Sequence, residues 1–89
     1  MNVKAKVIQS LPMVSGTRKN DNTPWYKATL VVETIEQYPR KIAISNIKKA
    51  HEFAQLQLGA TYSFDYNVES HLFNGRWFTE VTCWNWNNA

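Results

Sequence analysis

The sequence predicts an all-β protein in which five strands close into a Greek-key barrel, with one short helix between the third and fourth strands. Three observations support this prediction. Most of the chain alternates polar and apolar residues with the period of two that is typical of half-buried strands. Apolar residues recur at helical spacing between Ile47 and Leu58. Asn74-Gly75, a strong signal for a β-hairpin turn, divides the last third of the chain into two strand-like segments.

Length and composition favour a single domain over residues 1–89, because a chain of 89 residues is close to the size at which one hydrophobic core suffices. No apolar run approaches the roughly 20 residues of a membrane-spanning helix, and the N-terminus has no secretory signal. We therefore expect a soluble protein of the cytoplasm, or of the host cytoplasm if a phage encodes it, with no membrane partner. One cysteine and two distant histidines favour no metal site, and we expect no cofactor.

The first two strands follow from the alternation. Residues 3–11 place Ala5 and Val7 on the face that we expect to be buried. Residues 11–24 contain two prolines, one glycine and a polar run, which is typical of a long, mobile hairpin loop. Residues 25–34 alternate again and form the second predicted strand.

The third strand and the helix follow a turn at Gln37-Tyr38-Pro39. Residues 40–45 are strand-like, and Asn46 is a residue type that accepts hydrogen bonds from the first free amides of a helix. The apolar spacing that follows predicts a helix of about three turns, which ends at Leu58-Gly59.

The last strand carries large rings on both of its faces. Val81 and Cys83 share one face and look buried, which would leave Trp84, and with it Trp86, on the outside. A bulge would exchange the two faces.

The predicted order is three strands, one helix and two strands, the last two at residues 61–73 and 76–86. This is the order of the OB-fold, in which one sheet face and two hairpin loops form the ligand groove. An SH3-like barrel is the alternative, and it ranks second because it normally lacks a three-turn helix at this position.

Four stretches of the chain carry a family resemblance: residues 3–9 (VKAKVIQ), 31–34 (VVET), 36–39 (EQYP) and 74–78 (NGRWF). They resemble a family of small bacterial and phage proteins known as domain of unknown function 3127, over nearly the whole chain. The resemblance implies an OB-fold similar to that of bacterial single-stranded DNA-binding proteins. It also implies that Phe73 and Tyr38 lie near ring positions of those proteins. Ser45 stands where they have a stacking phenylalanine, and the acidic tail that recruits replication enzymes is not seen after Ala89.

Proteins bind single strands without reading sequence by means of cations that follow the phosphates and rings on which bases stack. The net charge of +3 favours a polyanion, and three clusters place a ring within three residues of a cation. The cluster residues predicted to bind nucleic acid are Trp25, Tyr26 and Lys27, then Tyr38, Arg40 and Lys41, then Phe73, Arg76 and Trp77. The other interpretation is that the rings form the core or cross-strand pairs and the cations solvate a sheet face.

Four more cations and one ring complete the predicted interface. Lys4 and Lys6, on the outer face of the first strand, would extend the phosphate track, although lysines there also protect a strand edge from aggregation. Arg18 and Lys19 in the first loop would close over a bound strand. Trp84 would be a second stacking surface or part of a subunit contact.

We therefore predict a non-enzymatic module that binds single-stranded DNA with little sequence preference. A role in replication, in recombination or in the processing of a phage genome would fit. RNA as the ligand, and assembly into a homo-oligomer, stay open. The alternative is a protein-interaction barrel, as a homodimer or a subunit of a larger complex, whose exposed rings form an apolar interface. An enzyme is disfavoured because Asp65 and Glu69 share a strand face without a nucleophile or metal cluster beside them.

Overall fold

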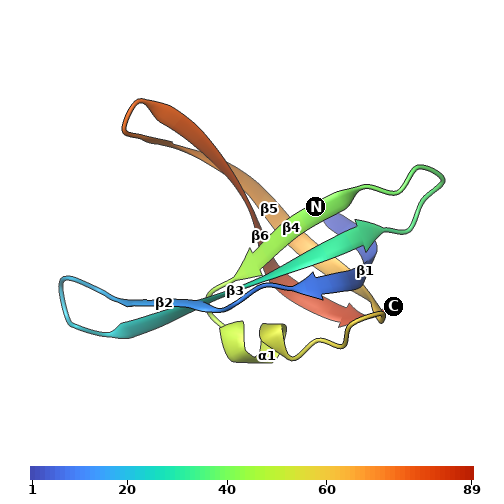
Figure 1. Cartoon of the computed structure of the whole chain (residues 1–89), viewed down its shortest axis with the longest axis horizontal. Helices are drawn as coiled ribbons and strands as arrows, with labels where there is room; N and C mark the ends of the chain where they lie inside the picture. The colour runs from blue at the N-terminus through green and yellow to red at the C-terminus, as the bar shows by residue number, and fades with distance from the viewer.

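A computed structural model of the protein describes residues 1–89 and contains six strands and one helix. In chain order the elements are β1 (Asn2–Ser10), β2 (Val14–Thr17), β3 (Pro24–Thr34), β4 (Lys41–Asn46), α1 (Ala50–Ala54), β5 (Thr61–Phe73) and β6 (Arg76–Asn88). The hydrogen-bonded order of the sheet is β1-β5-β6-β4-β3-β2, and an additional pairing of β1 with β3 closes it (Figure 1). Five strands thus form the predicted OB-fold barrel, with β2 as an extension. The helix, five residues long, is too short and not apolar enough to cross a membrane.

The alternation along β1 and β3 places the core where the sequence predicts it. Ala5 and Val7 of β1, with Leu30 and Val32 of β3, are fully buried. The register of the β1–β3 pair shifts between Val7 and Gln9, and this bulge bends β1 so that its first half pairs with β5. One strand therefore pairs with both of its neighbours and closes the barrel.

Helix α1 closes one end of the barrel with a single large side chain. The Phe53 ring is fully buried, and its centroid lies 6.2 Å from that of Phe64 and 5.2 Å from that of Trp86. The predicted three-turn helix is wrong in length, because the chain has to return to β1. The amides of Gln55 and Leu56 still donate to carbonyls three residues back. The amide of Gly59 then donates to the carbonyl of Val7, and the amide of Val7 donates to the carbonyl of Ala60, so residues 59 and 60 are bonded to β1 instead of to a helix.

The segment that the sequence predicts as a long loop contains β2. This strand pairs with the first four residues of β3, and the two form the β2–β3 ribbon (residues 14–17 and 24–27), which extends beyond the barrel. Gly16 pairs with Trp25, and a Cβ atom at position 16 would lie 2.6 Å from the Trp25 ring. The ring therefore needs a glycine beneath it.

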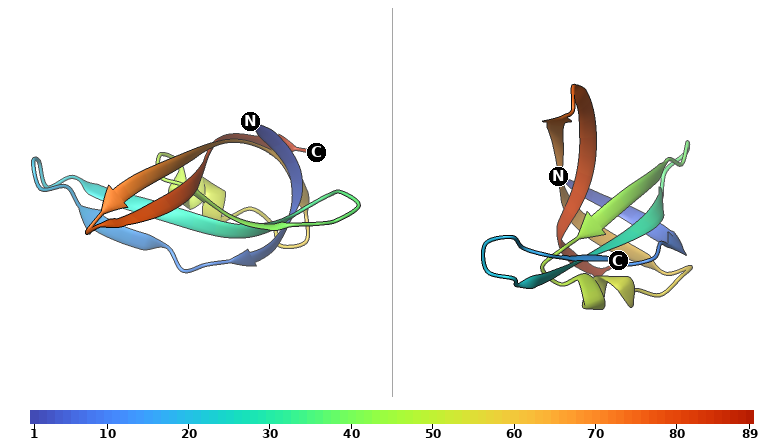
Figure 2. Two further views of the ribbon diagram at one scale, coloured as in Figure 1. Left: turned by 90° about the horizontal axis from the view of Figure 1, so that it is seen from above. Right: turned by 60° about the vertical axis from the view of Figure 1, so that its left-hand side comes forward.

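β5 and β6 also extend beyond the barrel. Their outer parts form the β5–β6 arm (residues 67–81), and the predicted turn at its tip is confirmed, since Asn74 and Gly75 have φ angles of 50° and 75°. Figure 1 shows the arm above and the β2–β3 ribbon below, both to the left of the barrel, and the left view in Figure 2 shows that they leave the barrel at the same end.

A bulge in β6 separates the tryptophans of the last strand. Asp65 pairs with Asn85 and Tyr66 with Cys83, so Trp84 has no partner opposite. Cys83 is buried as predicted, Trp84 is 60% exposed, and Trp86 packs against the core. The bulge thus returns Trp86 to the inside of the barrel while Trp84 stays outside.

Candidate functional site

A groove lies where the β5–β6 arm approaches the outer faces of β3 and β4. It has a volume of about 310 Å³. The alternation of β3 creates it, because Ala28 and Leu30 point into the core while Lys27 and Thr29 point outward. The residues that line the groove are Lys27, Thr29, Ala43, Ser45, Phe78, Thr79, Glu80 and Val81.

One ion pair joins the two sides of the groove. Nζ of Lys27 on β3 donates to Oε1 of Glu80 on β6 at 2.9 Å, and Nε2 of His71 lies 3.5 Å from the other carboxylate oxygen. The hydrogen bond from Lys27 lowers the pKa of Glu80 below its ordinary value, so Glu80 is ionised at neutral pH. The Lys27 cation is therefore already paired with a carboxylate, which a phosphate group would have to replace.

The Phe73 and Phe78 rings and the Arg76 cation lie on one face of the arm. His71 pairs with Phe78, and Phe73 with Arg76, in the same register that places Glu69 opposite Glu80. Side chains two residues apart share a face of a strand, so Phe73, Arg76 and Phe78 lie on the face of the arm that carries Glu80. Of these three side chains, Phe78 lines the groove.

These arm residues contact one another. The Phe73 and Phe78 centroids lie 6.5 Å apart, and the Arg76 guanidinium lies 5.9 Å from the centre of the Phe78 ring. The two rings are 64% and 47% exposed. Phe78 was not predicted as a site residue, although the two-residue turn fixes its pairing and so places it with Arg76.

Trp77 lies on the opposite face of the arm from Phe73 and Arg76. It pairs with Leu72, and both side chains are largely exposed, Trp77 at 71%. The third predicted cluster is thus divided between the two faces of one hairpin.

The first predicted cluster is divided as well. Trp25 and Lys27 lie on the outer face of β3, whereas Tyr26 lies on the inner face, where its ring contacts His51 of α1 edge-on at 4.7 Å between centroids. Lys27 therefore lines the groove, Trp25 lies on the same face of β3, and Tyr26 belongs with the helix.

The second predicted cluster lies at the other end of the barrel, around the loop between β3 and β4 (Figure 1). Tyr38 is 78% exposed there, Nε of Arg40 lies 3.5 Å from Oε1 of Glu36, and Lys41 pairs with Glu33. Tyr38 and Arg40 are not brought together with the ribbon and the arm.

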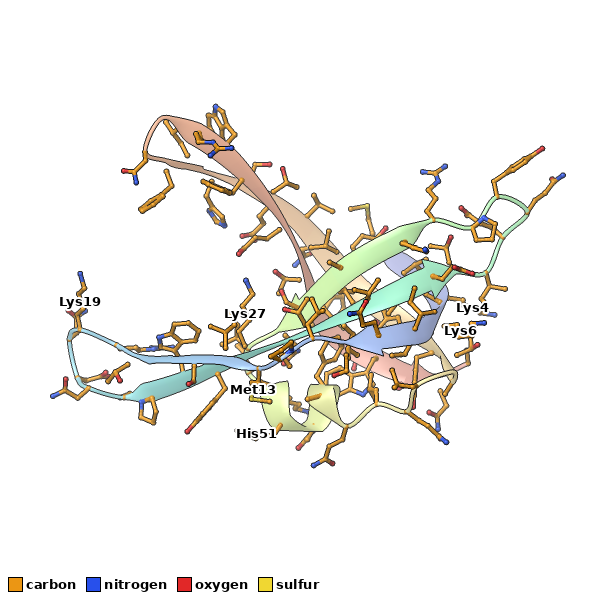
Figure 3. The ribbon with its side chains drawn as sticks, in the orientation of Figure 1. Lys4, Lys6, Met13, Lys19, Lys27 and His51 are labelled. Atoms are coloured by element: carbon orange, nitrogen blue, oxygen red, sulfur yellow. The ribbon has the colours of Figure 1, made fainter.

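The remaining predicted residues fall in three places. Figure 3 shows Lys4 and Lys6 side by side at the end of the barrel away from Lys19, which lies at the tip of the β2–β3 ribbon. Arg18 and Trp84 line a second hollow, next to the groove, together with Lys48 and Lys49. The two lysines before α1 were not predicted as site residues.

The lone cysteine has a structural setting. Cys83 is buried and its thiol donates to the carbonyl of Asn85 at 3.1 Å. Burial raises the pKa of the Cys83 thiol to about 11, so it is protonated at neutral pH.

Comparisons with known proteins identify a family and a fold. The model of the family described as "Domain of unknown function (DUF3127)" matches residues 2–87. No curated protein matches the chain. Among solved structures, the chain is similar to a small single-stranded DNA-binding protein from Streptomyces coelicolor, with 12% sequence identity and a TM-score of 0.53. The match covers 100% of this chain and 92% of that chain, and it confirms the predicted fold.

Proposed function

We propose that this chain, which belongs to the family described as a domain of unknown function (DUF3127), binds single-stranded DNA without catalysis and with little sequence preference. The observation that carries the proposal is the arm face toward the groove, where the exposed Phe73 and Phe78 rings lie beside Arg76. Bases of any kind stack on such rings, so a strand would bind to this surface whatever its base sequence.

The position of the groove supports the proposal. OB-folds bind oligonucleotides on the face of their second and third strands and between the loops that follow strands one and four. Here those strands are β3 and β4, and the loops are the tips of the β2–β3 ribbon and the β5–β6 arm. On the ribbon side Lys27 lines the groove, and Trp25 shares the outer face of β3 with it. The similar protein from Streptomyces coelicolor is itself described as binding single-stranded DNA.

A second candidate function has its own support on the outer face of the arm. Val68, Leu72 and Trp77 lie on one face of the hairpin and are 47%, 59% and 71% exposed. Large apolar and aromatic side chains of this kind are typical of protein contacts. A protein-interaction barrel, as a homodimer or a subunit of a complex, would use this face, and its binding would change little with salt.

The Lys27–Glu80 pair supplies a sharp test of the groove. Glu80→Gln is expected to tighten binding of a single-stranded oligonucleotide about 2- to 5-fold, because it frees the Lys27 cation and removes a negative charge that repels phosphate. One additional phosphate contact should also make the slope of log affinity against log salt steeper by about 0.7. Fluorescence anisotropy of a labelled thymine oligonucleotide measures both quantities.

Glu36→Gln is the matched control, since it removes one carboxylate from an ion pair at the far loop and changes the net charge equally. The groove proposal predicts a larger gain for Glu80→Gln than for the control. Equal gains would show that only net charge matters, and weaker binding by Glu80→Gln would contradict a phosphate at Lys27.

A further inference from the structure

We infer that the hollow next to the groove, between Arg18, Lys48, Lys49 and Trp84, is a second nucleotide subsite. It would hold one base on Trp84 and the adjoining phosphates between the three cations, as the strand leaves the groove. This inference rests on the proposed function and extends it to residues outside the face of β3 and β4. We call this hollow the basic hollow.

The basic hollow has the size and charge of a binding site. Its volume of about 540 Å³ exceeds that of the groove and lies within the range of about 300–1,000 Å³ that is usual for ligand sites. Its lining contains three cations and no carboxylate. The residues are Arg18, Asn46, Ile47, Lys48, Lys49, Thr82, Cys83 and Trp84.

The three cations are not paired with acidic side chains. The ion pairs of the protein involve Lys27, Arg40 and His71, and none involves Arg18, Lys48 or Lys49. Asp21 lies near Arg18, and its pKa is lowered mainly by hydrogen bonds from Thr23 and to a smaller degree by Arg18, while Glu52 lines a neighbouring hollow with Lys48 and Lys49 without forming an ion pair with either. The hollow therefore has an unneutralised positive charge, unlike the Lys27 position in the groove.

One buried side chain holds the lysines beside the ring. Oδ1 of Asn46 accepts a hydrogen bond from the amide of Lys49 at 2.7 Å, and its Nδ2 donates to the carbonyl of Cys83 at 2.9 Å. Asn46 is 4% exposed. The segment before α1 is thus tied to the residue that precedes Trp84, which fixes the cations and the ring relative to each other.

Trp84 is free to stack because of the β6 bulge. It has no cross-strand partner, and it makes no ring contact of the kind by which Trp86 packs on Phe53. An exposed indole ring next to cations is the combination on which a base stacks while its phosphate is neutralised.

The groove and the basic hollow adjoin where β4 pairs with β6. Ser45 lines the groove and Asn46 the hollow, and across from them Val81 lines the groove and Thr82 the hollow. Ser45 pairs with Thr82, and its Oγ donates to the carbonyl of Val81 at 3.4 Å. In the path that we propose, the bound strand passes this junction on its way from the groove to Trp84.

The test compares two oligonucleotide lengths on the full chain. Lys48→Gln/Lys49→Gln and Trp84→Ala are expected to bind a thymine oligonucleotide of about 6 residues nearly as the wild type does. For one of about 16 residues, near the upper end of OB site sizes, each variant is expected to lose about 5-fold or more. The lysine double variant should also reduce the salt slope by about 1.4 for the longer oligonucleotide.

Lys4→Gln/Lys6→Gln is the control, because it removes the same charge from exposed positions at the far end of the barrel. Losses that are equal for both lengths, or no larger than those of this control, would overturn the subsite while leaving the groove intact. Failure of the wild type to bind either oligonucleotide would overturn the proposed function and the subsite with it. All of the replaced side chains except Trp84 are polar, and Trp84 is 60% exposed, so folding should be retained.

Discussion

Phe73→Ala/Phe78→Ala is expected to weaken binding of single-stranded DNA more than any other change on the surface of this protein. Stacking contributes about 1–3 kcal/mol for each base, so each ring that carries a base should account for about a 5- to 150-fold loss in affinity. The two rings are the large exposed apolar groups on the face of the arm that carries Glu80, and Arg76 loses its ring partner when Phe78 is removed. Anisotropy titration of wild type and variant with the same oligonucleotide measures the loss.

Leu72→Ala/Trp77→Ala is the matched control for the arm. It removes two exposed apolar side chains from the same hairpin, next to the same turn, but from the opposite face. We expect it to leave DNA binding close to that of the wild type. If it weakens binding as much as the phenylalanine double variant, the assignment of the binding face is wrong. If it changes only self-association or a protein contact, the outer face is a protein interface.

Phe53→Ala is expected to have the largest effect on stability. The ring is fully buried at the end of the barrel and contacts Phe64 and Trp86, so truncation removes apolar burial and leaves a cavity. Replacements of this kind cost about 3–5 kcal/mol in the free energy of unfolding, a large part of the roughly 5–15 kcal/mol of a typical domain. Denaturant unfolding followed by tryptophan fluorescence measures the change.

Leu58→Ala provides the comparison for Phe53. Leu58 is apolar and follows α1 at helical spacing, but it is 60% exposed. Its truncation is expected to change the free energy of unfolding by no more than about 0.5 kcal/mol. Similar costs for the two variants would contradict the placement of Phe53 as the residue that closes the barrel.

Much of the fold could be predicted because the relevant signals are local. The alternation that buries Ala5, Val7 and Leu30 and the Asn74-Gly75 turn are properties of neighbouring residues. β2 could not be predicted in the same way. Its sequence, VSGT, has little strand character, and it exists because it pairs with β3 and supports the Trp25 ring at Gly16.

The length of the helix depended on contacts that the sequence does not display. Ile47 and Leu58 complete a helical pattern, yet both are exposed, and only Ala50 and Phe53 of this stretch are buried. The hydrogen bonds of residues 59 and 60 with Val7 determine where the chain must leave the helix.

The site was predicted in part, because proximity in sequence does not fix the face of a strand. Adjacent residues point to opposite sides, so Tyr26 and Trp77 separate from their neighbours Lys27 and Arg76. Lys48 and Lys49 were missed because they are far from Trp84 in the sequence, and only the folded chain brings them to the same hollow. Phe78 and Glu80 are site residues that the hairpin register could have identified.

The most direct measurement is a titration of the tryptophan fluorescence with an unlabelled thymine oligonucleotide of about 20 residues at two salt concentrations. Trp25 and Trp84 lie beside the proposed path, so binding should quench the fluorescence to saturation at low salt. With about three phosphates neutralised, a fourfold rise in salt should weaken binding about 20-fold. Absence of binding, confirmed by sedimentation, or an affinity that does not change with salt, would contradict the proposal that the groove binds single-stranded DNA.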